Sequence, residues 1–353
     1  MGFKPLKYKG REIKLKKAIT EPNFMGRTVL ALDPWKFVDL WLKRKRQDEA
    51  RFYWQQSHDF YLATENLPTT SSPLVAYYCI LNAVKALLIV KKLQFSEKHG
   101  VHGKSENQKG KISLLKEKVI FEGKGVLLAL CNHLDENSNL ITYNLKQLLY
   151  NLPYIHRAYC LTFRSEPEIF IPIKKPRFVR KIGSKEAWFI AEIEPNFINR
   201  YKRHINKILP NDFERDEGIK TTFLIRKKTR LKWEKDKSKE DENIIRLYNY
   251  HKSVRKLTFY IYAPTWLWYL KRKQNLTNII NRSSLTITFS AMHRLSELCR
   301  YEPLILLKHL ESQHNWLISE FISNSLKQFI DETSAEITGK DFMIPGMRES
   351  NSK

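Results

Sequence analysis

The sequence has only four cysteines, and they provide no pair at metal-binding or redox spacing. Cys79, Cys131, Cys160 and Cys299 lie far apart, and each stands in an apolar stretch. Buried free thiols in a reducing compartment are expected from such a pattern, rather than disulfides or zinc ligands. A cytoplasmic location is therefore the expectation.

Targeting and membrane segments are also missing. The N-terminus MGFKPLKYKGREIKLKK is basic, but no apolar segment follows it, so no secretory signal is predicted. The longest apolar run, residues 73–90, has the length of a membrane span, but it contains Lys85. A lysine there would cost about 2.5–3.5 kcal/mol in a bilayer. We expect a soluble protein that makes no membrane contact.

Common catalytic signatures are absent as well. The sequence contains no GxGxxG, HExxH or GxSxG motif. The segment HGKS at 102–105 is similar to the end of a phosphate loop, but that loop would need a glycine where Lys98 stands. His99 and His102 have HxxH spacing without a third ligand. No metal and no other cofactor are predicted.

Positive charge is what the sequence has in excess. Its 62 Lys and Arg residues outnumber 37 Asp and Glu, which gives a formal net charge of +25. Such a surplus favours a polyanionic partner, because binding to phosphates releases counterions and adds affinity that is independent of sequence. RNA, DNA or an acidic protein is therefore the expected partner.

Several basic clusters lie beside aromatic residues. This mixture can follow a phosphate backbone and stack bases. For any single cluster the alternative is a solvated turn or strand edge, which lysines also protect. The predicted nucleic-acid-binding residues are Lys174, Lys175, Arg177, Arg180, Arg200, Arg203, Arg226, Lys227, Lys228, Arg230 and Trp233.

Hydrophobic periodicity indicates helices at both ends of the chain and short strands between them. Helices are expected near residues 33–46, 48–67, 72–90, 124–134, 144–163, 284–301 and 315–337, and strands near 168–173, 186–194, 221–226 and 256–263. The predicted fold class is α+β and mostly α. Its parts are a basic N-terminal arm (1–30), a helical core in two pieces (31–163 and 266–342), an inserted β-rich basic region (164–265) and a C-terminal tail (343–353).

Two of the predicted helices carry a polar stripe on an apolar surface, and two histidines stand in a glycine turn between them. Side chains at helical spacing share one face of a helix. Such a stripe either joins a satisfied buried network or lines a cleft for an anion, and both readings stay open. The candidate anion-binding residues are Tyr78, Asn82, Lys85, His99, His102, His293, Glu297 and Arg300.

Several motifs together carry a family resemblance. The segments ARFYWQQSHDFYLA, SSPLVAYYCILNAVKALL, HGVHGK with LLKEKVIFEGKGVLLAL behind it, and LCRYEP occur in the order seen in YaaC-like proteins of bacteria. The chain resembles this family over roughly residues 50–163 and 285–340. No settled activity comes with the family, so the resemblance implies kinship without a mechanism.

A second resemblance is to HEPN helical domains, on Tyr77, Tyr78, residues 85–88, His99 and Gly100. Such domains are common in toxin–antitoxin and phage-defence systems, and some are metal-independent ribonucleases that use an arginine and a nearby histidine. The resemblance therefore implies a HEPN-like helical core.

Arg51 and His58 would be the corresponding catalytic pair in this chain. They share a helix face at i, i+7, where the histidine could act as general acid or base and the arginine could stabilise the phosphate. Arg–His pairs at such spacing are as frequent here as chance predicts. Catalysis therefore stays undecided, and binding without catalysis is favoured.

The expected function is that of a cytoplasmic YaaC-like protein that binds RNA or DNA in a bacterial defence or stress-response system. Processing of the bound nucleic acid is a further hypothesis. The alternative is a non-enzymatic interaction or scaffold subunit that docks a partner protein of the same operon. A homo-oligomer is compatible with both.

Overall fold

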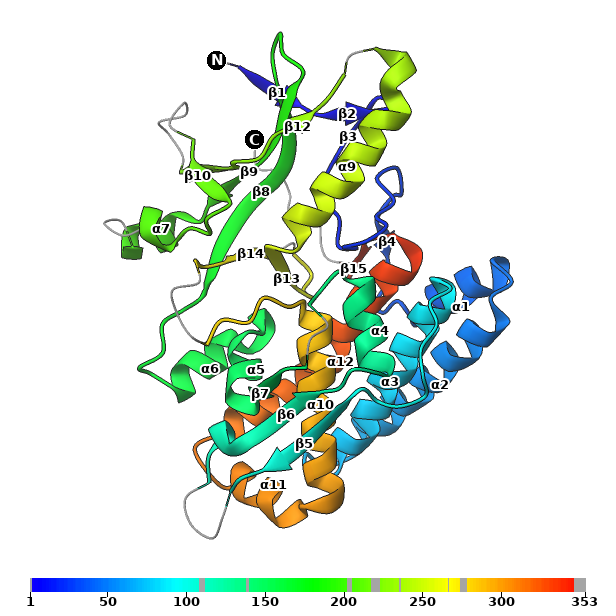
Figure 1. Cartoon of the computed structure of the whole chain (residues 1–353), viewed down its shortest axis with the longest axis vertical. Helices are drawn as coiled ribbons and strands as arrows, with labels where there is room; N and C mark the ends of the chain where they lie inside the picture. Colours follow the sequence, from blue (N-terminus) through cyan, green and yellow to red (C-terminus); the bar gives the residue numbers. More distant parts are fainter. Residues whose placement is uncertain are drawn as a thin grey trace.

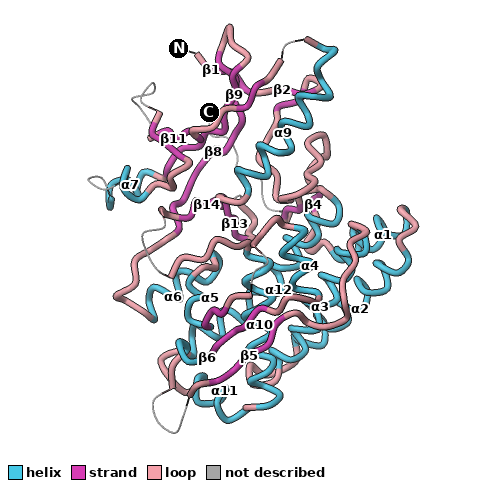
Figure 2. The backbone as a smooth tube through the Cα atoms, viewed as in Figure 1, coloured by secondary structure: helices cyan, strands magenta, loops and turns pink. Residues whose placement is uncertain are grey.

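The computed structural model describes residues 2–107, 112–137, 140–201, 205–216, 223–234, 236–265, 267–273 and 278–345. These residues form a helical half and a half built on a curled β-sheet, which lie end to end along the long axis (Figure 1). Figure 2 shows that the helices gather in one half and the longest strands in the other. The chain crosses between the halves several times.

The helical half is built around α3 (Ser72–Val90). Pro73 stands in its first turn, where the missing N–H group costs no hydrogen bond. Helix α3 packs against α2, α10 and α12, and nearly every side chain from Ala76 to Leu88 is buried. The other helices of this half are α1 (Trp35–Arg44), α2 (Asp48–Glu65), α4 (Val126–His133), α5 (Leu145–Tyr150), α6 (His156–Thr162), α10 (Ser284–Tyr301), α11 (Pro303–Leu310) and α12 (Asn315–Thr338).

By length and composition, α3 could cross a membrane, and no other helix in the described ranges could. However, 67% of its apolar window is buried inside the protein. Lys85 on this helix is paired with Glu97. Helix α3 is therefore the core helix of a soluble fold.

The other half holds an antiparallel sheet with the strand order β10-β11-β9-β8-β14-β13, to which β1 adds beside β8 and β12 beside β9. Its strands are β1 (Phe3–Pro5), β8 (Phe170–Lys181), β9 (Glu186–Ile193), β10 (Phe213–Arg215), β11 (Leu224–Lys227), β12 (Leu231–Lys232), β13 (Thr258–Ile261) and β14 (Leu267–Lys271). The sheet curls like half of a barrel. Helix α9 (Glu240–Arg255) buries Leu247, Tyr250 and Val254 in the same core as the sheet.

Smaller elements complete the fold. A three-stranded antiparallel sheet, β5 (Val101–Ser105), β6 (Glu117–Phe121) and β7 (Thr142–Asn144), lies against α10 in the helical half. The sheet half also has two short helices, α7 (Pro195–Tyr201) and α8 (Ile205–Ile208). Two strand pairs are β2 (Lys7–Tyr8) with β3 (Arg11–Glu12) and β4 (Val29–Leu30) with β15 (Phe342–Met343), and short 3-10 helices are η1 (Leu114–Lys116), η2 (Pro153–Ile155) and η3 (Lys237–Lys239).

The prediction of a mostly helical, HEPN-like core with a small inserted sheet is wrong. The fold is α+β, but its main sheet has eight strands. Strand β1 comes from the predicted basic arm, and β14 comes from a segment predicted to lie in the helical core. Leu6, Ile13 and Leu15 of the arm are buried in the core of the sheet. Their apolar signal was hidden because lysines and arginines surround them.

Many individual elements match their predictions. Helix α10 has the predicted bounds, and the Ser283 side chain accepts a hydrogen bond from the Thr286 N–H at its start. The expected helix at 144–163 is divided near Pro153 into α5 and α6. Helix α9 was not predicted, because its charged sequence shows only a weak apolar stripe.

Candidate functional site

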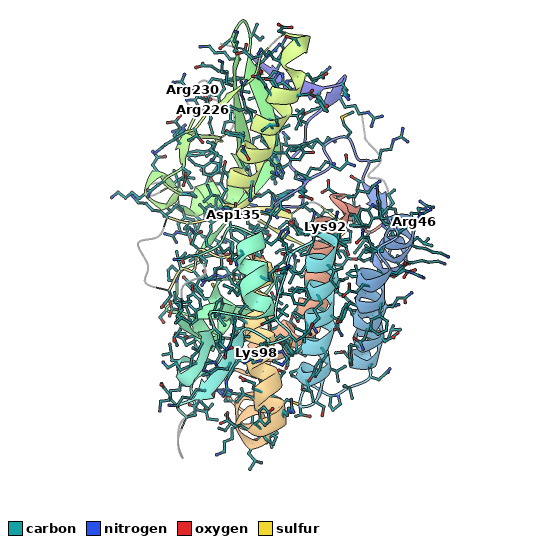
Figure 3. All side chains as sticks on the ribbon, turned by 45° about the vertical axis from the view of Figure 1, so that its right-hand side comes forward. Arg46, Lys92, Lys98, Asp135, Arg226 and Arg230 are labelled. Atoms are coloured by element: carbon teal, nitrogen blue, oxygen red, sulfur yellow. The ribbon has the colours of Figure 1, made fainter. Side chains whose placement is uncertain are left out.

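A cleft of about 660 Å³ lies between α3, α10 and the β5–β6 hairpin. We call it the polar cleft. Six of the eight predicted anion-binding residues line it: Tyr78, His99, His102, His293, Glu297 and Arg300. Lys98, labelled in Figure 3, also lines it. Asn82 and Lys85 are buried farther along α3 and do not line the cleft; Lys85 is paired with Glu97.

Glycines allow the backbone segments of the cleft to approach one another. Gly100 and Gly125 have φ values of +83° and +107°, which favour glycine, and their backbones are in close contact. The first amides of α4, at Val126 and Leu127, donate to the carbonyl oxygens of Lys98 and His99 at 2.8 and 3.0 Å. The histidine-glycine turn is thus fixed to the start of α4.

Gly103 brings strand β5 against α10. A Cβ atom at this position would overlap the side chains of Arg294 and Glu297. The Gly103 N–H donates to Glu297 Oε1 at 3.0 Å. The second glycine of HGVHGK therefore serves close packing of β5 on α10.

Tyr77, His99 and His293 form an aromatic cluster in the wall of the cleft. The Tyr77 hydroxyl lies 2.7 Å from His99 Nδ1, and the His293 ring centroid is 4.8 Å from that of Tyr77 and 5.4 Å from that of His99. Burial lowers the pKa of His293 to about 3. Burial, with the charges of Lys85 and Arg300, also lowers the pKa of His99. Both imidazoles are therefore neutral at pH 7, and His99 Nδ1 shares a hydrogen bond with the Tyr77 hydroxyl.

His293 keeps one polar atom without a hydrogen bond. Its side chain is only 7% exposed, and no described residue hydrogen-bonds to Nδ1. The nearest carboxylate oxygen, Glu297 Oε2, lies 3.7 Å away. A buried polar atom without a partner is costly, so this nitrogen is available for a ligand or a water molecule in the cleft.

A buried ionic network supports the cleft from below. Arg294 donates to Glu117 Oε2 at 2.8 and 3.1 Å, to Glu297 at 3.2 Å and to Glu302 at 2.9 Å. His309 Nε2 lies 3.2 Å from the other oxygen of Glu117. Burial pushes the pKa of Glu117 upward, but the hydrogen bonds of His309 and Arg294 outweigh it and lower that pKa. Glu117 is therefore an ionised carboxylate in the core.

The rim of the cleft is cationic and aromatic. Lys98, Lys124 and Arg300 are exposed, and none of them has a carboxylate at ion-pair distance in the part of the chain that the structure describes. The Arg300 guanidinium lies 4.8 Å from the ring centroid of Tyr301, which is 65% exposed. The rim can therefore offer positive charge and a stacking surface together.

The predicted catalytic pair lies elsewhere. Arg51 and His58 are both on α2, and neither lines the polar cleft. Arg51 donates to both carboxylate oxygens of Asp39, at 2.8 and 3.2 Å. The His58 ring lies 4.8 Å from the ring of Trp35. These contacts commit both side chains to packing between α1 and α2.

Most of the predicted nucleic-acid-binding residues have carboxylate partners. Six of them are ion-paired: Lys174, Lys175, Arg177, Arg200, Arg226 and Arg230, the last two labelled in Figure 3. Lys227 and Trp233 are buried in the sheet half. Arg180 and Lys228 have no carboxylate at ion-pair distance within the described ranges, and Arg203 lies outside the described residues.

Several residues of the site were missed by the sequence analysis. Glu117 stands between lysines and looked like an exposed strand residue, and its burial depends on Arg294 from a distant part of the chain. Arg294 gave a stronger signal, because it is adjacent to the predicted stripe on α10. Lys98 and Lys124 gave none, since isolated lysines are common on surfaces.

No group of three or more His, Cys, Asp or Glu side chains that could hold a metal ion occurs in the described residues. The polar cleft offers the neutral imidazoles of His99 and His293, tyrosine hydroxyls and the rim cations, beside the carboxylates of Glu122 and Glu297. The imidazoles, hydroxyls and cations can hydrogen-bond to an anion and neutralise it.

Fold and site define a two-part α+β protein with a cation-rimmed polar cleft in its helical half. A family model described as YaaC-like protein matches residues 17–337, and the chain belongs to the YaaC-like family. The resemblance seen in the sequence is thereby confirmed, whereas the similarity to HEPN domains is not supported. The search of curated proteins and the search of solved structures returned no match.

Proposed function

We propose that this protein is a cytoplasmic nucleic-acid-binding protein, and that the polar cleft receives part of an RNA or DNA strand. The observation that carries the proposal is the rim, where Lys98, Lys124 and Arg300 face solvent beside Tyr301. Cations supply affinity for the phosphate backbone, and an exposed aromatic ring stacks a base.

The size of the polar cleft agrees with this proposal. Small-molecule sites typically have volumes of about 300–1,000 Å³, and a site of this volume can hold one nucleotide of a strand. The cleft measures about 660 Å³. Within it, the buried Nδ1 of His293 and the imidazole of His99 are available to hydrogen-bond a phosphate or a base.

The polar cleft is favoured over the outer face of the sheet, although the sheet carries most of the basic clusters. Lys175 is paired with Glu192 at 3.1 Å, and Arg230 is paired with Glu186. A phosphate that binds there must compete with these carboxylates. At the rim, Lys98, Lys124 and Arg300 have no such carboxylate partner among the described residues, and the two carboxylates that line the cleft, Glu122 and Glu297, face His102 and Arg294 instead.

The proposal concerns binding. Arg51 and His58, the pair considered for cleavage, lie outside the cleft, and Arg51 is held by Asp39.

The test is a comparison of two double variants with equal loss of charge. Lys98→Ala/Arg300→Ala removes two cations from the rim, and Lys175→Ala/Arg230→Ala removes two from the sheet. Binding of fluorescent single-stranded RNA and DNA is measured by anisotropy between 50 and 200 mM salt. We expect the parent to lose affinity steeply with salt, and the rim variant to show a salt slope smaller by about 1.4, since each phosphate contact on a single strand contributes about 0.7.

The control variant should keep most of the parent's affinity. The proposal fails if the parent binds neither RNA nor DNA at 50 mM salt. It also fails if the two double variants lose affinity equally, because the rim would then have no special part in binding.

A second candidate function is the docking of a partner protein of the same operon, as in a scaffold subunit. Leu304 and Leu307 are exposed on α11, and Trp316 is exposed at the start of α12. Leu304 and Leu307 share one face of α11 at i, i+3 spacing, and adjoining exposed apolar side chains favour a protein contact. A complex held by this surface should survive the salt range that dissociates nucleic acid.

A further inference from the structure

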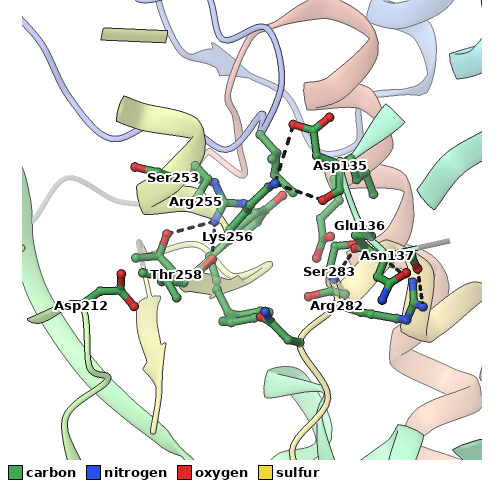
Figure 4. Close-up of a pocket in the computed structure, with 18 of the residues that line it drawn as sticks. Asp135, Glu136, Asn137, Asp212, Ser253, Arg255, Lys256, Thr258, Arg282 and Ser283 are labelled. Carbon is green, nitrogen blue, oxygen red and sulfur yellow. Dashed lines mark hydrogen bonds and ion pairs between the residues drawn. The ribbon is translucent and has the colours of Figure 1, made fainter. Parts of the chain in front are cut away.

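A second cavity lies at the junction between the helical half and the sheet half, and we call it the junction cavity. Its volume is about 550 Å³. In Figure 4, Arg255 and Thr258 project from the sheet half, and Glu136, Arg282 and Ser283 stand across from them, with Lys256 between the two groups. A smaller cavity of about 200 Å³ adjoins it and shares Asp212, Lys256 and Phe259 with it.

Three buried cations converge on these cavities from three elements. Lys227 ends β11, Arg255 ends α9 and Lys271 ends β14. Lys227 and Arg255 line the junction cavity, and Lys271 lines the adjoining one. Their exposed fractions are 4%, 5% and 8%.

The partners of the three cations are uncharged. Lys227 Nζ donates to Ser253 Oγ at 2.9 Å, and Lys271 Nζ donates to the Ile280 carbonyl oxygen at 2.9 Å. Arg255 donates to the carbonyl oxygen of Lys17 at 2.9 and 3.0 Å and to that of Thr258. Among the described residues, no carboxylate lies at ion-pair distance from any of the three.

Such an arrangement is costly without a counter-charge, because a buried cation loses its hydration. Burial lowers the pKa of Lys227, of Arg255 and of Lys271, the last to about 7. Arg282, in the wall of the same cavity, shows the contrast, since it is paired with Glu136 at 3.1 Å.

The carboxylates that remain in the cavities do not supply the missing charge. Glu332 lines the junction cavity, but burial raises its pKa to about 7, so it is partly protonated at neutral pH. Asp212 is exposed at the edge where the two cavities meet. Lys271, with a pKa of about 7, is also only partly protonated at neutral pH, so the excess positive charge of the interior comes mainly from Lys227 and Arg255.

We propose that the junction cavity binds a small organic phosphate of mononucleotide size. A phosphomonoester carries about −1.5 to −2 charges at pH 7, so it can neutralise several cations where a single carboxylate cannot. Phe259 offers an apolar surface, and Asn281 and Asp212 can hydrogen-bond to hydroxyl or amino groups of the ligand. The volume lies within the usual range of small-molecule sites.

The test uses calorimetric titration with three probes: inorganic phosphate, adenosine monophosphate and adenosine. The full-length parent should bind the monophosphate, and adenosine should bind at least tenfold more weakly because it lacks the phosphate. The double variant Lys227→Met/Lys271→Met should lose at least tenfold in affinity for the monophosphate. Without ligand it should melt at the same or a higher temperature, since removal of an uncompensated buried charge is neutral or stabilising.

The sheet variant Lys175→Ala/Arg230→Ala serves as the matched control, because it removes two cations that line neither cavity and should keep the parent's affinity for the monophosphate. The inference is overturned if neither phosphate nor the monophosphate binds at millimolar concentration, or if the Lys227/Lys271 variant binds like the parent. The inference is independent of the proposed nucleic-acid function, since one variant removes cations of the junction cavities and a different variant removes cations of the polar cleft.

Discussion

Buried charges occur both in the network beneath the polar cleft and in the junction cavity, but they have different partners in the two regions. Arg294 beneath the cleft has carboxylate partners in Glu117, Glu297 and Glu302. Lys227 and Lys271 at the junction donate to a hydroxyl and a carbonyl oxygen. In the first region, carboxylates of the protein compensate the buried cation, whereas in the second region the two lysines lack a counter-charge.

Because of this difference, the network beneath the cleft has a structural role, whereas the junction cavity is suited to bind a ligand. A compensated buried network fixes the geometry of the elements that contribute to it, here β6, α10 and the start of α11. A set of buried cations without carboxylate partners is stabilised when an anionic ligand supplies the missing counter-charge. Substitutions in the two regions should therefore change stability in opposite directions.

The largest effect is expected for Arg294→Met. Removal of one partner from a buried ionic network costs about 3–5 kcal/mol, because it leaves an unpaired buried charge. Here that charge is Glu117, whose side chain is inaccessible to solvent. The measurement is urea unfolding at pH 7. Arg200→Met is the control, since its pair with Glu168 is partly exposed and should contribute less than about 1 kcal/mol. Equal losses in both variants would contradict this account of the network.

Gly103→Ala should have the next largest effect. The added methyl group would overlap Arg294 and Glu297, and overpacking of this kind typically costs about 1–3 kcal/mol. Gly123→Ala is the matched control, because a Cβ at Gly123 would meet nothing within 4 Å. Unfolding curves should show a clear loss for the first variant and almost none for the second. A stable Gly103→Ala protein would mean that β5 does not need to approach α10 so closely.

Lys271 should make stability depend on pH at the junction. Its pKa is lowered to about 7 in the folded protein, whereas an unfolded lysine titrates near 10.4. Between these values the unfolded state binds more protons, so the free energy of unfolding rises with pH, by about 1.4 kcal/mol for each unit at most. Lys271→Met should remove this rise.

Guanidinium unfolding of parent and variant at pH 7 and pH 9 measures the effect. The advantage of Lys271→Met over the parent should be greatest at or below pH 7 and should shrink as the pH increases. A constant difference between the two proteins would show that Lys271 keeps its ordinary pKa.

Local patterns in the sequence predicted elements better than they predicted which elements meet. Helix α10 was predicted with its bounds, since Ser283 provides the cap and the apolar residues follow a helical period. The stripes on α3 and α10 were also visible. That they line one cleft with a glycine turn depends on contacts between residues about two hundred positions apart, such as Gly103 and Glu297, which periodicity does not encode.

The prediction for Lys227 shows a signal that was present but not used. It was assigned to a basic surface cluster, yet it belongs to β11, where side chains alternate between the two faces. Ile225 and Lys227 are buried on one face, and Arg226 between them is partly exposed on the other. The alternation could have placed Lys227 inside. That it is buried without a carboxylate follows only from the assembled junction.

Tyr77→Phe should have the smallest effect and tests the compensated region at a single hydrogen bond. The variant removes the hydroxyl that lies 2.7 Å from His99 Nδ1, which should cost about 0.5–1.5 kcal/mol of stability. A hydroxyl that donates to an imidazole nitrogen favours the neutral ring, so its loss should also raise the pKa of His99 toward its ordinary value. NMR titration of the imidazole measures this shift, and Tyr78→Phe, which retains the Tyr77 hydroxyl, is the control. If His99 titrates identically in both variants, the hydroxyl does not hold that ring in its neutral form, and burial with the charges of Lys85 and Arg300 accounts for the lowered pKa.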